Sequence, residues 1–485
     1  MSCDQESEAS STGNSLAVRR EFLKFSAALG TGLVLAQRPL LAVSARPAEI
    51  STTGRPIVDL TLIPPGPVTN QITLDVRGAV WNRDHTGSKY EFTFYVDAEA
   101  PENMLHRESV AIPDGSAAGV RFGWDVRRYA GNRRVILVAR SGGRIFRTTQ
   151  AMEIMDSNVR STRQLGGAWI EFYHWSEQEG KLYNAQLAKM TASQWRQLVR
   201  AMYQVNQNLI VVQNMFWDDN HHHIGAAGYH GKSFYPSQLF PGRMPIACRD
   251  PLEAVLSEAD RLGMEVMPGV GLYAWFDYSL ASLNWHQRVA SELWERYGHH
   301  PSFYGWYVSE EQFGNLGNPA QRNNMVRFFR EFTAYVRRLA PNKPVMLATN
   351  SFGLQGAQAA YRKLLPNLDI LATFGFQRMP KGDLTGVQAA ALLQSLCDRA
   401  GTHFWLDLES FVFRNGNELY PRPVGQIATV LDHLTGFEKT LQYEFTGMMS
   451  SPAMSRQPGG PPSVKLYEGY QKYLRTVGGR PPAKG

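Results

Sequence analysis

His403-Phe-Trp-Leu-Asp-Leu-Glu409 has the composition of a buried β-strand and ends in a carboxylate. Earlier in the chain, Phe303-Tyr-Gly-Trp-Tyr-Val-Ser-Glu-Glu311 has the same form. In a parallel barrel the carboxyl ends of all strands meet at one face, and that face holds the chemistry. The two segments therefore predict an α/β fold in which carboxylates from separate strands converge.

A strand–helix alternation extends outward from these segments over residues 161–485. Amphipathic stretches separate the strand candidates, at residues 193–205, 252–262, 288–297, 325–339, 389–400 and 464–474. There are eight candidate strands, at residues 168–172, 209–213, 265–270, 303–308, 345–349, 370–374, 403–408 and 441–445. This count predicts a (β/α)8 TIM barrel. An open doubly wound sheet is the alternative, although it rarely uses so many consecutive units.

Residues 46–160 have a different rhythm. Short alternating runs such as 57–62, 71–76, 90–96 and 134–139 are separated by turn residues, with no helical periodicity between them. This spacing predicts a small all-β sandwich domain followed by a linker. Its role could be carbohydrate binding, but we expect a structural spacer.

The N-terminal residues 1–45 resemble a twin-arginine signal peptide. Arg19 and Arg20 precede Phe-Leu-Lys, a weakly apolar stretch follows, and Val43-Ser-Ala45 offers small residues for cleavage. The resemblance implies a periplasmic or secreted protein. No later segment is long and apolar enough to span a bilayer, so we expect no integral membrane segment after signal removal.

Strand parity selects the side chains that face the barrel lumen, because successive residues point to opposite faces. We expect the apolar residues of three strands to face the helices; they are Ala168, Ile170 and Phe172, then Tyr304, Trp306 and Val308, then Phe404, Leu406 and Leu408. The lumenal set of those strands is then Trp169, Glu171, Tyr173, Gly305, Tyr307, Ser309, Glu311, His403, Trp405, Asp407 and Glu409. The eighth strand is ambiguous, and Gln442 and Glu444 are the expected lumenal pair.

Two of these carboxylates suit the hydrolysis of a glycosidic bond. A retaining glycosidase needs one acid/base and one nucleophile about 5 Å apart. Glu311 suits the first role because neighbouring Glu310 would favour its protonated form, and Glu409 suits the second. Tyr307, Tyr443 or His403 could orient the nucleophile. Predicted catalytic residues are thus Glu311, Glu409 and Glu310.

Aromatic and polar residues near the same strand ends are the candidate sugar contacts, with Trp169 and Trp405 as stacking platforms. The predicted substrate-binding residues are Trp169, Glu171, Asn214, Trp217, Tyr307, Trp405, Asp407 and Tyr443.

The placement of Glu311 and Glu409 on the fourth and seventh strands is similar to clan A glycoside hydrolases. Four segments resemble more closely a family of secreted glycosidase-like barrels that is catalogued as a domain of unknown function; they are Gly167-Ala-Trp-Ile-Glu171, Gly305-Trp-Tyr-Val-Ser-Glu-Glu311, Trp405-Leu-Asp-Leu-Glu-Ser-Phe411 and Tyr443-Glu-Phe with Met449-Ser-Ser-Pro452. The resemblance covers about residues 165–475 and implies that Glu311 and Glu409 are the working pair. Clan A enzymes commonly have Asn before the fourth-strand Glu, whereas this chain has Glu310.

Other features carry less weight. Asp218-Asp-Asn-His-His-His223 could bind a metal, but consecutive histidines rarely converge on one ion. Gly269-Val-Gly-Leu-Tyr-Ala274 imitates a dinucleotide fingerprint without a following helix, so we expect no cofactor. The net charge of +7 is scattered rather than clustered and gives no nucleic-acid footprint. Cys248 and Cys397 could form a disulfide or remain two free thiols.

The sequence as a whole predicts an exported glycoside hydrolase whose partner is a carbohydrate substrate. A non-catalytic glycan-binding barrel is the main alternative, and a metal-dependent hydrolase that uses the histidine loop is a weaker one. The oligomeric state, the sugar and the linkage do not follow from the sequence.

Overall fold

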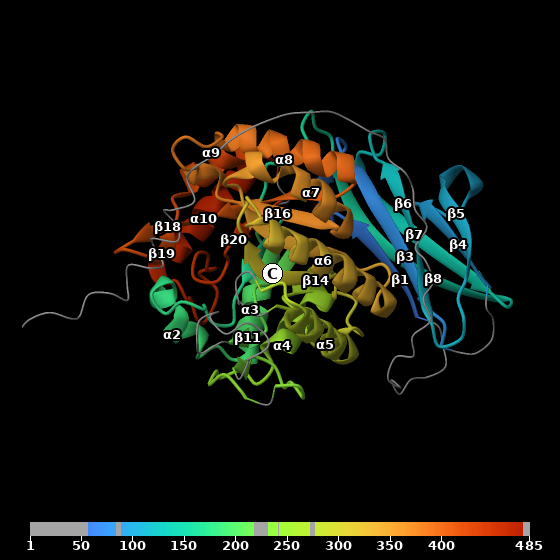
Figure 1. The fold of residues 1–485 in the computed structure, drawn as a ribbon, viewed down its shortest axis with the longest axis horizontal. Helices are drawn as coiled ribbons and strands as arrows, with labels where there is room; N and C mark the ends of the chain where they lie inside the picture. The colour runs from blue at the N-terminus through green and yellow to red at the C-terminus, as the bar shows by residue number, and fades with distance from the viewer. Residues whose placement is uncertain (1–56, 84–88, 218–230, 241, 272–276, 479–485) are drawn as a thin grey trace, which may run out of the picture.

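The computed structural model describes residues 57–83, 89–217, 231–240, 242–271 and 277–478. Figure 1 shows two parts, a layer of strands β1–β8 and a larger unit in which strands and helices alternate. The twin-arginine segment lies outside the described residues.

The first part consists of two β-sheets packed face to face. The sheets have the strand orders β1-β3-β6 and β2-β8-β7-β4-β5. They share one apolar core that includes Leu74, Phe92 and Leu137. The strands are β1 (Ile57–Ile63), β2 (Val68–Thr69), β3 (Thr73–Trp81), β4 (Lys89–Val96), β5 (Met104–Ala111), β6 (Ala117–Asp125), β7 (Gly131–Ser141) and β8 (Arg144–Met155). This arrangement is a β-sandwich.

The second part is a parallel barrel of eight strands in the order β13-β10-β9-β20-β17-β16-β15-β14. Bridges from Val266 to Phe303 and from Gly269 to Tyr307 join its two end strands and close it. The strands are β9 (Gly167–Ile170), β10 (Leu209–Val212), β13 (Glu265–Pro268), β14 (Trp306–Gln312), β15 (Val345–Asn350), β16 (Ile370–Phe374), β17 (His403–Glu409) and β20 (Lys439–Tyr443). The chain is therefore a TIM barrel preceded by a β domain, as the sequence predicts.

Helices connect the strands and cover the barrel (Figure 1). Several begin at a capping box, for example at Thr191, Asn318 and Thr385, where side chains satisfy the first free N–H groups. The α-helices are α2 (Asn184–Leu187), α3 (Ala192–Tyr203), α4 (Pro251–Leu262), α5 (Leu280–Tyr297), α6 (Pro319–Leu339), α7 (Gln358–Leu364), α8 (Gly386–Ala400), α9 (Val424–His433) and α10 (Gly460–Thr476). No helix among the residues described is long and apolar enough to cross a bilayer.

Shorter elements complete the loops. Two hairpins, β11 (Phe216–Trp217) with β12 (Lys232–Ser233) and β18 (Phe411–Arg414) with β19 (Glu418–Pro421), follow barrel strands at their carboxyl ends. The short 3-10 helices are η1 (Pro101–Asn103), η2 (Glu179–Leu182), η4 (Leu354–Ala357), η5 (Leu365–Asn367) and η6 (Phe376–Arg378).

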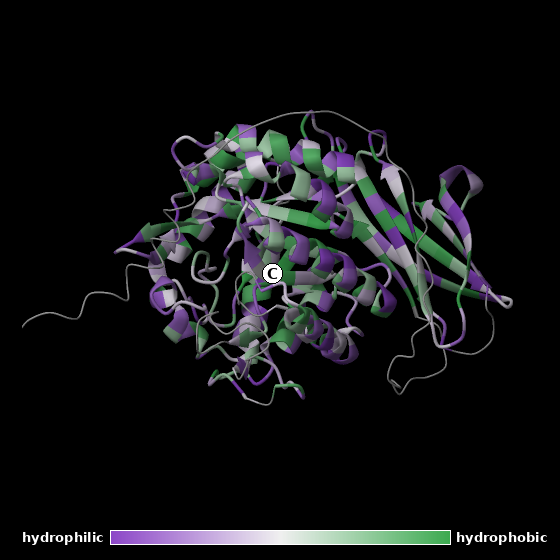
Figure 2. Cartoon of the chain, in the orientation of Figure 1, coloured by the Kyte–Doolittle hydropathy of each residue, from purple (hydrophilic) through white to green (hydrophobic). Residues whose placement is uncertain are grey.

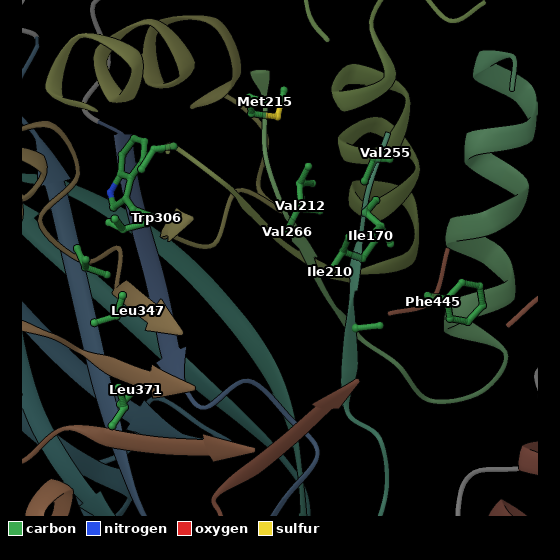
Figure 3. Close-up of a cluster of buried hydrophobic side chains, with 14 of the residues drawn as sticks. Ile170, Ile210, Val212, Met215, Val255, Val266, Trp306, Leu347, Leu371 and Phe445 are labelled. Atoms are coloured by element: carbon green, nitrogen blue, oxygen red, sulfur yellow. The ribbon is translucent and has the colours of Figure 1, made fainter. Parts of the chain in front are cut away.

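The layer between strands and helices is apolar because alternate strand residues point outward. Figure 3 shows part of this layer, with Ile170, Ile210, Val212, Leu347 and Leu371 among the buried side chains. Figure 2 shows hydrophobic barrel strands within helices that mix hydrophobic and hydrophilic residues. A helix that packs one side against a sheet needs hydrophobic residues on that side and hydrophilic residues on the other.

The β-sandwich closes the end of the barrel at which the strands begin. Ile63 of β1 belongs to the buried lumenal cluster, and the Tyr304 hydroxyl donates to the Leu62 carbonyl at 2.9 Å. Arg77 of β3 forms a buried ion pair with Asp369 at 2.6 Å. The lumen is thus sealed at this end, and the opposite end, where the strands finish, remains for a functional site.

Candidate functional site

A pocket lies at the carboxyl ends of the barrel strands and encloses about 570 Å³, including its open mouth. Both predicted glutamates, Glu311 and Glu409, line it. The lining residues come from loops and strand ends around the barrel; they are Trp175, Glu179, Gln213, Tyr307, Glu311, Ala348, Phe374, Arg378, Asp407, Glu409, Phe411, Phe413, Leu419 and Tyr443. The structure therefore brings the carboxylates of the fourth and seventh strands together.

The backbone of strand β14 is irregular in the segment that contains Glu311. Its register against β15 shifts between Val308 and Gln312, so the end of the strand bulges. Glu311 lines the pocket despite this bulge. The side chain of Glu310, the third predicted catalytic residue, lies outside the described part of the chain.

The predicted outward orientation of Tyr304 is wrong. Trp306 and Val308 pack in the helix layer as expected, but Tyr304 belongs to the lumenal cluster. The regular strand begins only at Trp306, after Gly305, so the alternation cannot be extended back to Tyr304. Its side chain fills the sealed end of the lumen instead.

Strand β17 follows the predicted parity along its length. Phe404, Leu406 and Leu408 pack toward the helices, whereas Trp405 belongs to the lumenal cluster. Glu409 is 2% exposed, and its Oε1 accepts a 2.7 Å bond from Nε of Arg378. A charge-assisted bond of this kind fixes the direction of a carboxylate.

His403 cannot orient Glu409, because it lies at the other end of β17. Its Nδ1 is 2.5 Å from Glu438, and its Nε2 is 3.6 Å from Asp75 of the β-sandwich. This expectation was wrong, since a seven-residue strand separates its first and last side chains by the height of the barrel.

Asp407 is a third lumenal carboxyl group in the pocket and is 4% exposed. Burial raises the pKa of Asp407 well above its usual value, and the nearby charges of Glu409 and Glu311 raise it further. Asp407 therefore carries a proton under conditions in which an exposed aspartate would be ionised.

The eighth strand has the opposite parity to the prediction. Leu441 belongs to the lumenal cluster, and Tyr443 packs against it and lines the pocket. Gln442 points outward, where its side chain donates to Gln207 at 3.1 Å. The polar Gln442 finds a buried amide partner behind the strand, and sequence alternation alone cannot reveal such a partner.

A buried hydrogen-bond network stands behind Tyr443. The Tyr443 hydroxyl donates to Glu171 at 2.5 Å, and Glu171 lies 2.5 Å from Nδ1 of His174. The other ring nitrogen of His174 lies 3.2 Å from Glu179, which lines the pocket. Burial lowers the pKa of His174, but Glu171 and Glu179 outweigh it and hold that pKa well above its usual value.

Glu171, His174 and Glu444 offer ligand atoms within 4.8 Å of one another, a spacing that could hold a metal ion. Their polar atoms already have partners within the protein. Both carboxylate oxygens of Glu444 accept hydrogen bonds, from Tyr183 and Thr446, and His174 lies between two glutamates. A satisfied network of this kind is stable without an ion.

The predicted aromatic platforms, Trp169 and Trp405, lie in the lumenal cluster beneath the pocket, and both are almost fully buried. Trp175, Phe411 and Phe413 line the pocket itself. Asn214 and Trp217 also lie outside this lining: Asn214 donates to the Phe216 carbonyl at 2.7 Å, and Trp217 packs edge-on against Tyr173. Tyr307, Asp407 and Tyr443 do line the pocket.

Two charged pocket residues, Arg378 and Glu179, were not among the sequence candidates. Arg378 follows β16 in η6, and Glu179 begins η2 after β9. The signal available was their position shortly after a strand end, the region where barrels place functional groups. The residue types of Arg378 and Glu179 did not mark them as pocket residues, because exposed arginines and glutamates are common in loops.

Of the remaining sequence candidates, the structure tests the two cysteines. Cys248 and Cys397 are both buried free thiols, so the disulfide alternative is wrong. The histidine run, residues 218–223, lies outside the described residues, as do residues 272–274 of the glycine segment.

Comparisons with known proteins agree with this architecture. A solved structure titled "putative alpha-L-fucosidase" from Bacteroides thetaiotaomicron superposes with a TM-score of 0.50 at 17% identity, covering 66% of this chain and 96% of the other. The β-glucuronidases of dog (Canis lupus familiaris) and cat (Felis catus) are each 35% identical over 102 residues. That match spans 20% of this chain and 15% of each relative.

The fold and the pocket define a TIM barrel with an acidic, aromatic-walled site at the carboxyl ends of its strands. Residues 165–456 match the model of a family described as a domain of unknown function, DUF4434. Because this match covers more than half of the chain, the protein belongs to the DUF4434 family.

Proposed function

We propose that the protein is an exported glycoside hydrolase that cleaves glycosidic bonds in a poly- or oligosaccharide. The observation that carries the proposal is the convergence of Glu311 and Glu409, from the ends of the fourth and seventh strands, on one pocket. A pair of carboxylates on either side of a glycosidic bond is the usual requirement for its hydrolysis. The fold of the fucosidase structure and the partial similarity to β-glucuronidases support this class.

In this proposal Glu409 is the nucleophile. Glu409 lines the pocket and accepts a hydrogen bond from Arg378 on its Oε1, whereas its buried Oε2 has no hydrogen-bond partner among the described residues. Glu311, from strand β14, is the acid/base. It would protonate the leaving oxygen and then activate the water that releases the sugar, as in a retaining mechanism.

The aromatic side chains Trp175, Phe411 and Phe413 would form the walls against which a sugar ring packs its apolar face. The resemblance of residues 1–45 to a twin-arginine signal supports export to the periplasm or beyond.

The test is the release of reducing sugar by the purified protein from a panel of bacterial and plant polysaccharides. We expect release from at least one polysaccharide, and a loss of more than about 1,000-fold in both Glu311→Gln and Glu409→Gln, because each variant removes one half of an acting pair. Near-normal activity in both variants would contradict the assignment. Binding without release by the unaltered protein would instead identify a non-catalytic glycan-binding barrel.

A further inference from the structure

Carboxyl groups outnumber cations in the described lining of the pocket. Its described lining contains the carboxyl groups of Glu179, Glu311, Asp407 and Glu409, and Arg378 is the cation among them. Arg378 already has partners in the protein: its Nε donates a hydrogen bond to Glu409, and its guanidinium lies 5.2 Å from the centre of the Phe352 ring. A ligand therefore meets more carboxyl groups than cations in the described lining.

Two buried oxygens in this pocket lack a protein partner. Oδ1 of Asp407 and Oε2 of Glu409 have no hydrogen bond from the residues that the structure describes, although Asp407 is 4% and Glu409 2% exposed. Buried carboxylate oxygens are normally hydrogen-bonded, so both have acceptor capacity that the described residues do not satisfy. A donor that also carries positive charge would satisfy both oxygens and would favour the ionised form of Asp407.

The pKa of Asp407 is shifted in the direction that nearby negative charge produces. The charges of Glu409 and Glu311, together with burial, hold the pKa of Asp407 well above its usual value. By linkage, a cation that binds beside Asp407 favours the ionised form of its carboxyl, and the ionised carboxylate in turn binds the cation more tightly.

Building on the proposed hydrolase function, we propose that the sugar bound in the pocket carries a free ammonium group, and that the substrate is a de-N-acetylated amino-sugar glycan. An ammonium group has three donors and no acceptor, which matches acceptors such as Asp407 Oδ1 and Glu409 Oε2. A uronic acid would place a further carboxylate among these groups and would be repelled. An N-acetyl group would remove the charge that the pocket favours.

The basic character of the whole chain does not oppose this preference. The net charge of +7 is spread over 485 residues, and charges on the surface are screened beyond about 8 Å at physiological salt. Buried groups within the pocket are screened much less and decide which sugar it accepts.

The test compares two fully de-N-acetylated oligosaccharides, of glucosamine and of galactosamine, with their N-acetylated forms, a neutral glucan and an oligogalacturonate. Turnover is measured with the unaltered protein and affinity by calorimetry. We expect at least one de-N-acetylated chain to be bound and cleaved about 10-fold better than every other probe. In Asp407→Asn this advantage falls at least 10-fold. Glu179→Gln, which removes another carboxylate of the pocket lining, should also lower the preference for the de-N-acetylated chain. The control Asp398→Asn alters a half-exposed carboxylate on α8 and should leave that preference unchanged.

The outcomes separate this inference from the proposed function. Binding of a de-N-acetylated chain without any turnover supports the inference and contradicts the hydrolase. Preferred cleavage of a neutral, N-acetylated or uronate probe keeps the hydrolase and overturns the inference. The absence of binding and cleavage for both de-N-acetylated chains also overturns it.

Discussion

A single guanidinium sets the direction of the Glu409 carboxylate at the end of β17. The Arg378 Nε donates to Oε1 at 2.7 Å, and the Arg422 Nε donates to the Glu409 backbone carbonyl at the same distance. The side chain of Glu409 is thus held from one side and its main chain from another. If Glu409 is the nucleophile, Arg378 is a positioning residue that acts through it.

We expect Arg378→Gln to lower kcat while the protein still folds, because Arg378 is about a third exposed and the change preserves part of its length. Loss of a charged hydrogen bond costs about 1.5–3 kcal/mol, which corresponds to roughly 10- to 100-fold in rate. Steady-state kinetics and circular dichroism would check this. Unchanged kcat in a folded variant would show that Glu409 needs no support from Arg378.

The sequence predicted that Glu311 and Glu409 would reach one pocket, but it did not predict Arg378, which holds Glu409. Glu311 and Glu409 could be found because they end strands, which have a regular period. Arg378 could not, since it reaches Glu409 through the turn η6, whose course depends on tertiary packing. The opposite parity of Gln442 has a similar origin in its bond to Gln207.

Among the elements, the hairpin β18–β19 extends the wall of the pocket. It follows β17 immediately, and three of its residues, Phe411, Phe413 and Leu419, line the site. Figure 1 shows the hairpin at the side of the barrel remote from the β-sandwich. Phe413 is 39% exposed, so part of its ring is available to pack against a ligand in the pocket.

Phe413→Ala should reduce kcat/KM about 2- to 10-fold, mainly through KM, because aromatic packing against a ligand is worth about 0.5–1.5 kcal/mol. The melting temperature should change little, since the side chain is partly in solvent. The matched control is Val387→Ala, an exposed apolar residue on α8. Equal effects of the two substitutions on kcat/KM would exclude a role of the hairpin in binding.

The sequence located all eight barrel strands to within a few residues but missed this hairpin. Barrel strands are long apolar runs with helices between them, and that alternation is a strong signal. The hairpin strands are four residues each and mix exposed and buried positions, so their pattern resembles a loop.

Over the whole molecule, a buried charge network joins the β-sandwich to the closed end of the barrel. Arg77 pairs with Asp75 and Asp369, and Arg337 also reaches Asp369. His403 lies beside Asp75 and Glu438. Burial lowers the pKa of His403, but these two carboxylates raise it to about 9.

The protonated form of His403 therefore stabilises the folded protein. Because its folded pKa of about 9 exceeds the usual value, this contribution is complete below about pH 6.5 and is lost as the pH rises through 9. It amounts to at most roughly 3 kcal/mol. Other buried groups titrate in this window, including Lys439, whose pKa burial lowers to about 7. The contribution must therefore be isolated by a variant.

We expect the free energy of unfolding of the unaltered protein to exceed that of His403→Gln by an amount that shrinks between pH 6.5 and 9.5. Urea unfolding at several pH values would measure this difference. His433→Gln, at the exposed end of α9, is the control and should show no such trend. A difference for His403→Gln that does not vary with pH would mean that the histidine is uncharged in the fold.

The sequence predicted only in part that one end of the barrel is closed by the β-sandwich while the other end holds the pocket. The β-sandwich was predicted, but its use as a seal was not, because Ile63, Arg77 and His403 come from distant segments. Contacts of that range depend on how complete domains pack, and a local pattern carries no information about them.

The most direct test of the central claim is to identify the residue that becomes covalently attached to the sugar. The substrate found in the hydrolysis panel would be prepared as a 5-fluoro glycosyl fluoride, which slows both steps of a retaining reaction and keeps the substituent at carbon 2. The labelled protein would then be digested for mass spectrometry. We predict one added sugar per chain, on the peptide that contains Glu409, and no label in Glu409→Gln. A label on another residue, or full activity with no covalent label, would contradict the assignment of Glu409 as nucleophile.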